Sequence, residues 1–186
     1  MSKLIMWNLV TLDGFFEGAK SWDLDFHQSV WGDELERLSI EQLGSADSLI
    51  FGRITYEGMA AYWQTAKGEV ADFMNRLAKV VVSRTLERAD WPNTKLIKDN
   101  VAAEIQKLKQ QGGKNIFVFG SAKLSATLMQ HNLFDEYRIA VAPVLLGRGT
   151  PLFSQNPARL NLKLLDSRTL SNGCVMLRYE PRPFSD

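Results

Sequence analysis

The sequence FGRITYE at residues 51–57 has a counterpart in IFVFGSA at residues 116–122. Each places a glycine between an apolar run and an amphipathic segment, and the order strand, glycine turn, helix aims backbone N–H groups at a phosphate. Two such turns in one chain indicate a dinucleotide ligand. Arg53 lies beside the first glycine, and a guanidinium fork matches a phosphate better than a ribose hydroxyl. The pattern therefore favours NADPH over NADH.

Strands and helices are expected to alternate around these turns. Apolar runs predict strands at 4–10, 48–51, 79–84, 95–97, 115–119 and 134–141, and helical spacing predicts helices over 32–43, 53–62, 70–77, 101–111 and 122–129. The Asn-Gly pair at 172–173 predicts a tight hairpin between strands at 160–170 and 175–179. We expect an α/β fold of three layers: a mostly parallel mixed sheet, helices on both faces and an antiparallel C-terminal hairpin.

Composition narrows the possible partners. A chain of 186 residues fits one domain spanning 1–186. Its 22 basic and 21 acidic residues are balanced, and no basic run is interleaved with aromatics, which argues against nucleic acid. The apolar N-terminal run is too short for a signal peptide, and no run is long enough to span a membrane. Cys174, the single cysteine, lies in an apolar run and is expected to be buried, so a reducing cytoplasm is the predicted location.

Several motifs are shared with one known group of proteins. They are TLDGF at 11–15, GRITYE at 52–57, VSR at 82–84, FGSAKL at 119–124, LFDE at 133–136, VAPVLLGRG at 141–149 and PLF at 151–153. Together they resemble the dihydrofolate reductase superfamily, in particular the C-terminal reductase domain of bifunctional riboflavin-biosynthesis deaminase-reductases. The resemblance covers nearly the whole chain. It implies a dihydrofolate reductase-like fold and an NADPH-dependent oxidoreductase.

The resemblance also implies a cofactor site in two parts. Residues around the adenine-side phosphates would be Gly52, Arg53, Ile54 and Thr55, with Ser83 and Arg84 completing a 2′-phosphate pocket. Residues around the nicotinamide-side phosphate would be Gly120, Ser121, Ala122, Lys123 and Leu124. Many members have two glycines at the second turn where this chain has Gly120 and Ser121. Because serine is a good N-cap, we expect this phosphate site to persist.

Hydride transfer also requires a proton for the atom next to the reduced carbon. The predicted acids are Asp13, at the end of the first strand, and Asp25, in the long loop that runs to about residue 29, because a carboxyl in an apolar cleft keeps its proton near neutral pH. Asp13 can equally be a turn residue before a glycine, and Asp25 can be a solvated side chain. Asp23 and Asp33 remain alternatives.

Aromatic residues are the predicted wall for a flat substrate. The candidates are Trp22, Phe26, Trp31 and Tyr56, although aromatics near a loop also pack as satellite core. The two histidines, His27 and His131, lack metal-site spacing and are expected at the surface, so no metal is predicted.

The resemblance gives 5-amino-6-(5-phosphoribosylamino)uracil reductase as the closest named activity. Two departures weaken this choice of substrate: the apolar run after residue 55 replaces a polar segment that helps to hold a ribose phosphate, and Phe119 replaces an acidic residue. A dihydrofolate or pterin reductase is the alternative enzyme, and a catalytically silent nucleotide-binding module is the alternative of another class. By analogy with its relatives, the chain is also expected to form a homodimer, supported by the apolar strand 139–146.

Overall fold

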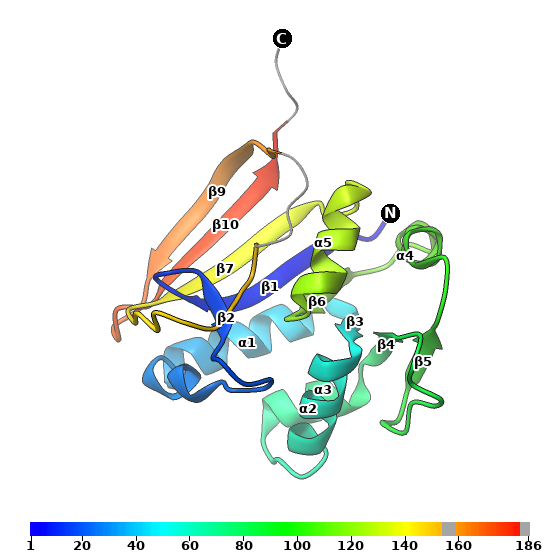
Figure 1. The fold of residues 1–186 in the computed structure, drawn as a ribbon, viewed down its shortest axis with the longest axis horizontal. Helices are drawn as coiled ribbons and strands as arrows, with labels where there is room; N and C mark the ends of the chain where they lie inside the picture. Colours follow the sequence, from blue (N-terminus) through cyan, green and yellow to red (C-terminus); the bar gives the residue numbers. More distant parts are fainter. Residues whose placement is uncertain (154–158, 183–186) are drawn as a thin grey trace.

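The computed structural model describes residues 1–153 and 159–182, which are built around an eight-stranded sheet (Figure 1). The strand order is β5-β4-β3-β6-β1-β7-β10-β9. The bounds are β1 Leu4–Thr11, β3 Ala46–Gly52, β4 Ala78–Val82, β5 Thr94–Ile97, β6 Asn115–Phe119, β7 Glu136–Ala142, β9 Leu162–Thr169 and β10 Val175–Pro181. Strands β5 to β7 in this order pair in parallel, and β10 is antiparallel to both β7 and β9. The predicted mixed sheet with an antiparallel C-terminal hairpin is confirmed.

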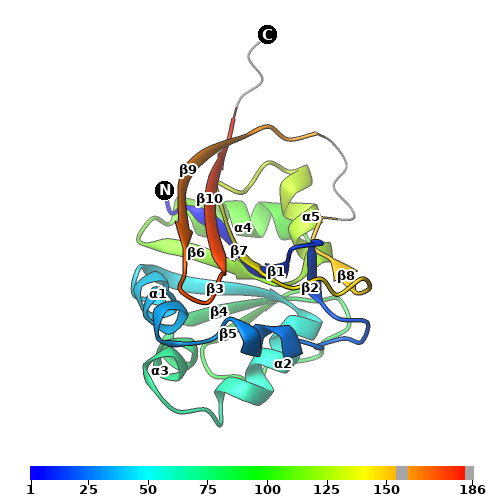
Figure 2. The same ribbon diagram turned by 90° about the vertical axis from the view of Figure 1, so that its left-hand side faces the viewer.

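Helices cover both faces of this sheet (Figure 2). Helices α1 Asp33–Gly44, α2 Arg53–Trp63 and α3 Glu69–Arg76 pack on one face, and α4 Val101–Gln110 and α5 Ala122–Gln130 pack on the other. Strand β1 shows the period of two that makes this possible: Ile5, Trp7 and Leu9 enter the first core, whereas Leu4, Met6 and Val10 enter the second. Within the described residues, no helix is both long enough and apolar enough to cross a membrane.

Three short elements were not predicted from the sequence. They are β2 Phe15–Glu17, the 3₁₀ helix η1 Asp25–Ser29 and β8 Thr150–Pro151. Strand β2 pairs with β8 to form a small second sheet, so the long loop after β1 is folded back and partly structured. Cys174 is fully buried, as predicted, and burial raises the pKa of its thiol to about 11.

The strand expected to support a homodimer has no free edge. Strand β7 ends at Ala142, and β1 and β10 pair with its two sides. The edge strands of the sheet are β5 and β9, and β9 is exposed along all 8 of its residues and extends beyond the helices together with β10 (Figures 1 and 2).

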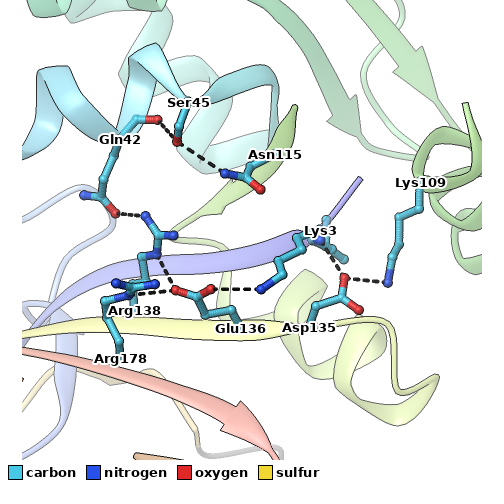
Figure 3. A network of polar contacts seen from close by, with 10 residues as sticks. Lys3, Gln42, Ser45, Lys109, Asn115, Asp135, Glu136, Arg138 and Arg178 are labelled. Carbon is cyan, nitrogen blue, oxygen red and sulfur yellow. Dashed lines mark hydrogen bonds and ion pairs between the residues drawn. The ribbon is translucent and has the colours of Figure 1, made fainter. Parts of the chain in front are cut away.

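An ionic network around the buried Glu136 ties the residue before β1 to β7, β10 and α1 (Figure 3). Glu136 is 1% exposed and accepts hydrogen bonds from Arg138 Nε at 2.7 Å and Arg178 Nε at 2.9 Å, while Lys3 Nζ lies 3.8 Å away. Burial alone would raise the pKa of Glu136, but the two arginines outweigh it and hold the pKa below its ordinary value. Arg138 also donates to Gln42 Oε1 of α1 at 3.2 Å, which fixes the orientation of that amide.

Candidate functional site

The two glycine turns meet at the carboxyl ends of neighbouring strands. Strands β3 and β6 are parallel neighbours, so the turns that follow them lie at the same edge of the sheet. Ser121 Oγ joins them, because it accepts a hydrogen bond from Gly52 N–H at 2.8 Å and donates to Thr55 Oγ1 at 2.9 Å. Gly120 has a φ of +55°, and a Cβ there would lie 3.0 Å from Thr55 Oγ1. A glycine is needed for this close approach.

The helices that begin at these turns have electropositive N-termini. In the described residues, none of the helices α1 to α5 has a side-chain cap, but they differ in charge: α1, α3 and α4 each carry at least one acidic residue in the first turn, whereas α2 and α5 carry none. Arg53 opens α2, and Lys123 is the second residue of α5. Because the first N–H groups of a helix have no intrahelical partner, residues 53–55 and 122–124 present donors for an anion.

Ser121 does not play the predicted part of a helix cap. Its backbone is left-handed, with φ 62° and ψ 59°, and its side chain makes no capping hydrogen bond to α5. The hydroxyl is directed instead to the first turn, where it occupies the N–H of Gly52. That N–H was predicted to meet a phosphate, so the donors that remain at the first turn begin at residue 53.

The residues predicted for a 2′-phosphate lie at adjacent strand ends. The register pairs Gly52 with Val82, so Arg53 follows one strand end and Ser83 and Arg84 follow the next. Both guanidiniums are accessible: that of Arg53 pairs with Glu57 Oε2 at 2.9 Å, and that of Arg84 is 86% exposed. The Ser83 hydroxyl accepts hydrogen bonds from the N–H groups of residues 85 and 86, so it stabilises its own turn.

Beside the turns lies a pocket, and a cavity lined by aromatic residues lies next to it. The pocket has a volume of ≈ 70 Å³ and is lined by Trp7, Asn8, Leu9, Phe16, Glu17, Trp22, Leu24, His27, Thr55, Met59, Phe119 and Gly120. The cavity, of ≈ 130 Å³, lies between the sheet and α1 to α3 and is lined by Trp7, Leu9, His27, Trp31, Leu35, Ser39, Gln42, Leu43, Met59, Trp63, Val70, Met74 and Phe119. Five residues belong to both, so the pocket and the cavity lie next to each other, and the two together are the candidate site.

The structure places two of the four predicted aromatic residues in the linings of the pocket and the cavity and two elsewhere. Trp22 lines the pocket and packs so closely on Gly58 of α2 that a Cβ there would overlap its indole, and Trp31 lines the cavity. Phe26 lies in the core, and Tyr56 is 4% exposed with its hydroxyl accepting the Trp91 N–H at 2.8 Å. Neither residue is among the described residues that line the pocket or the cavity, so this geometry gives no support to the prediction that they contact the substrate.

Trp7 and Phe119 form the part of the wall that sequence reasoning missed. Their rings are stacked with centroids 6.2 Å apart and planes 14° from parallel. They come from β1 and β6, which pair through the register Trp7 with Phe119. Because cross-strand neighbours point to the same face, the two rings lie together in the lining of both the pocket and the cavity.

His27 is a second residue that was missed, and it is half-buried rather than fully at the surface as predicted. It lines both the pocket and the cavity, and its Nε2 is buried without a hydrogen-bond partner. Burial lowers the pKa of the imidazole to about 4, so the ring is neutral at physiological pH. The Nδ2 of Asn8 and the Nε2 of Gln42 are likewise buried without partners and belong to residues that line this site.

The predicted proton donors do not lie in the site. Asp13 is exposed and accepts hydrogen bonds from Thr11 Oγ1 at 2.6 Å and from the N–H groups of residues 146 and 147, so it is a turn residue. The Thr11 bond, followed by the backbone bonds, lowers its pKa, which is the opposite of what a general acid needs. Asp25 is exposed at the start of η1. Of the carboxylates in the described residues, Glu17 alone lines the pocket, where it accepts from Trp22 N–H at 2.9 Å and Thr150 Oγ1 at 3.0 Å.

The chain belongs to the RibD C-terminal domain family, whose model matches residues 2–176. It is 34% identical over 184 residues to the uncharacterized protein YyaP of Bacillus subtilis strain 168, covering 95% of this chain and 94% of that protein. It is also 29% identical over 166 residues to the uncharacterized protein YwjB of the same organism, covering 87% and 89% of the two chains.

Solved structures share the fold. A putative riboflavin biosynthesis protein from Shewanella sp. PV-4 superposes with a TM-score of 0.78 at 21% identity, covering 97% of this chain and 99% of that one. A pyrimidine reductase-like protein from Corynebacterium diphtheriae gives 0.73 at 14% identity, with 98% and 93% covered. The predicted family and the dihydrofolate reductase-like fold are confirmed.

Proposed function

We propose that this protein is an NADPH-dependent reductase of a small heterocycle. One observation carries the proposal: the N-termini of α2 and α5 lie beside the pocket, and neither has an acidic residue in its first turn. Ser121 links the two turns by its hydrogen bond from the Gly52 N–H. One anionic pyrophosphate bridging both termini would match their dipoles, and a flat ring would match the stacked pair behind them. Membership of a reductase-domain family supports the same function.

Different residues of the chain would bind different phosphate groups of NADPH. The N–H groups of residues 53–55 and 122–124 would hold the pyrophosphate, with Lys123 adding a positive charge. Arg53 would exchange Glu57 for the 2′-phosphate, because a dianionic phosphate offers more acceptor oxygens than one exposed carboxylate. Arg84 would reach the same phosphate from the neighbouring strand end. NADPH, when bound, supplies a hydride from its nicotinamide ring.

The reacting rings would meet in the pocket beside Gly120. Trp7 and Phe119 would orient a flat ring by stacking, and Trp22, which packs on Gly58 of α2, lines the same pocket. Glu17 holds Trp22 in place by accepting hydrogen bonds from the Trp22 backbone N–H and the Thr150 hydroxyl. Since Asp13 and Asp25 lie outside the pocket, we propose that the proton comes from water that enters beside Glu17.

Among heterocycles, the family's closest named activity is reduction of a phosphoribosylamino-uracil. A deaminase/5-amino-6-(5-phosphoribosylamino)uracil reductase from Thermotoga maritima shares the fold with a TM-score of 0.67 at 14% identity, and this chain covers 57% of its length. Reduction of a pterin is the second candidate, supported by the flat aromatic walls. Binding of a nucleotide without turnover is the alternative to both, and the consumption of NADPH with a heterocyclic substrate distinguishes it.

The proposal is tested by titrating the protein with NADPH and with NADH while following tryptophan fluorescence. Arg53→Ala should weaken NADPH binding by about tenfold or more, because charge-assisted hydrogen bonds to the 2′-phosphate are lost, and should leave NADH binding unchanged. Arg88→Ala is the matched control, since Arg88 is an exposed arginine paired only with Asp90 in the described structure. If neither nucleotide binds, the proposed function is refuted.

We also propose that two copies pair through the β9–β10 hairpin. Strand β9 is the exposed edge, and Leu162, Leu164 and Leu165 on it are 38–50% exposed. A second copy would cover these leucines, which a solvated edge strand does not otherwise favour. Light scattering of the wild type should give twice the chain mass of 21.0 kDa, and the Leu164→Glu variant should have the mass of a single chain. A monomeric wild-type protein would contradict this pairing.

A further inference from the structure

The cavity beneath α1 to α3 differs from a phosphate-binding site in its charge. No lysine or arginine is among the described residues that line the pocket or the cavity, and Glu17 contributes a carboxylate. The nearest guanidinium by hydrogen bonding, that of Arg138, lies behind Gln42 and is paired with the buried Glu136 (Figure 3). Burying an unpaired anion there would carry a large desolvation cost.

The polar groups of the cavity are neutral and lack partners. Gln42 Oε1 accepts from Arg138, so the atom left over is the donor Nε2, which is buried without a partner in a residue that is 9% exposed. Figure 3 shows this nitrogen on the side of the amide away from the network. His27 Nε2 is the second buried atom without a partner, and the low pKa of its ring keeps it uncharged. Buried polar atoms are rarely left unpaired, so both point to a ligand that supplies hydrogen-bonding atoms.

The rest of the wall specifies the shape of that ligand. Trp7 and Phe119 contribute two nearly parallel rings to the lining, and Met59, Trp31 and Trp63 are further large side chains there. Aromatic and thioether groups favour a flat, polarisable ring.

We propose that the substrate is an uncharged, flat nitrogen heteroaromatic without a phosphate group, bound through ring or carbonyl acceptor atoms to Gln42 and through a hydrogen bond to neutral His27. This inference rests on the proposed reductase function and names the substrate class for its site. It separates this chain from a reductase of ribose-phosphate substrates, for which the cavity offers no cation among its described lining residues.

The test compares two probes of nearly equal shape, quinoxaline-2-carboxamide and quinoxaline-2-carboxylate. Each is titrated into the protein without NADPH, and the quenching of tryptophan fluorescence is followed, since three tryptophans line the cavity. The neutral carboxamide should bind at least about tenfold more tightly than the carboxylate, because an unpaired buried charge is penalised. Equal binding, or tighter binding of the carboxylate, would overturn the proposal.

A variant at His27 tests whether the carboxamide binds in this cavity. His27→Phe keeps an aromatic ring and removes Nε2. The variant should bind the carboxamide about fivefold to tenfold more weakly, because one hydrogen bond is lost. His131→Phe, at the exposed end of α5, is the matched control and should bind as the wild type does. Unchanged carboxamide binding by His27→Phe would overturn the role of His27.

Failure of the proposed substrate class can be told apart from failure of the proposed reductase function. Carboxamide binding in a protein that does not bind NADPH would support the cavity assignment and refute the reductase. NADPH binding without discrimination between the two quinoxalines would support the reductase and refute the substrate class.

Discussion

Protonation of His27 should make the fold sensitive to acid. The imidazole has an ordinary pKa of 6.5 that burial lowers to about 4 in the folded chain, so between these values the unfolded chain binds a proton that the folded chain does not. The free energy of unfolding therefore falls as the pH falls from 6.5 to 4. Each pKa unit corresponds to about 1.4 kcal/mol, so His27 should cost about 2.5 kcal/mol of stability at pH 4.5 and nothing above pH 7.5.

The assay is urea denaturation of the wild type and of His27→Phe at pH 7.5 and pH 4.5. Carboxylates elsewhere titrate in both proteins, so the comparison isolates residue 27. The variant should lose about 2.5 kcal/mol less than the wild type between the two pH values. His131→Phe should lose as much as the wild type does. If His27→Phe and the wild type lost stability in parallel, the imidazole would not be buried as the structure has it.

Three further perturbations test the packing around the site. Gly58→Ala should destabilise the protein despite the roughly 1 kcal/mol helix preference for alanine, because the new Cβ overlaps the Trp22 indole; a rise in melting temperature would contradict this contact. Glu136→Gln should cost about 3 kcal/mol, because it removes the buried carboxylate that pairs with the partly buried Arg138. Glu180→Gln, at an exposed pair, should cost less than about 1 kcal/mol, and similar losses for the two variants in urea denaturation would refute the network. Ser121→Ala should be about 1 kcal/mol less stable than Ser121→Gly, because only glycine avoids the cost of the left-handed backbone; equal stability would count against that conformation.

The turns and element boundaries were predictable because glycine and apolar periodicity are local signals. Gly52 and Gly120 end strands and precede helices as expected, and Asn172 with Gly173 turns the hairpin. The wrong predictions depended on partners distant in the sequence. Tyr56 is buried because its hydroxyl meets the Trp91 N–H, 35 residues away.

The inner part of the site could not be derived from local pattern. His27 follows a polar loop, and its burial depends on η1 packing against the sheet and α2, which no spacing reveals. In the sequence, Trp7 and Phe119 have the pattern of ordinary strand residues. They become neighbours only in the fold, where β6 pairs with β1. Asp13 showed the signature of a turn aspartate, and the hydrogen bonds from residues 146 and 147 support that interpretation over catalysis.

The central claim is that two helix N-termini bind the phosphates of NADPH. Amide chemical shifts from ¹H–¹⁵N spectra, recorded while NADPH is added, test it most directly. The account predicts the largest changes at residues 53–55 and 122–124, with residues 102–104 at the start of α4 unchanged. Changes confined to other parts of the chain, or no change at saturating NADPH, would contradict it.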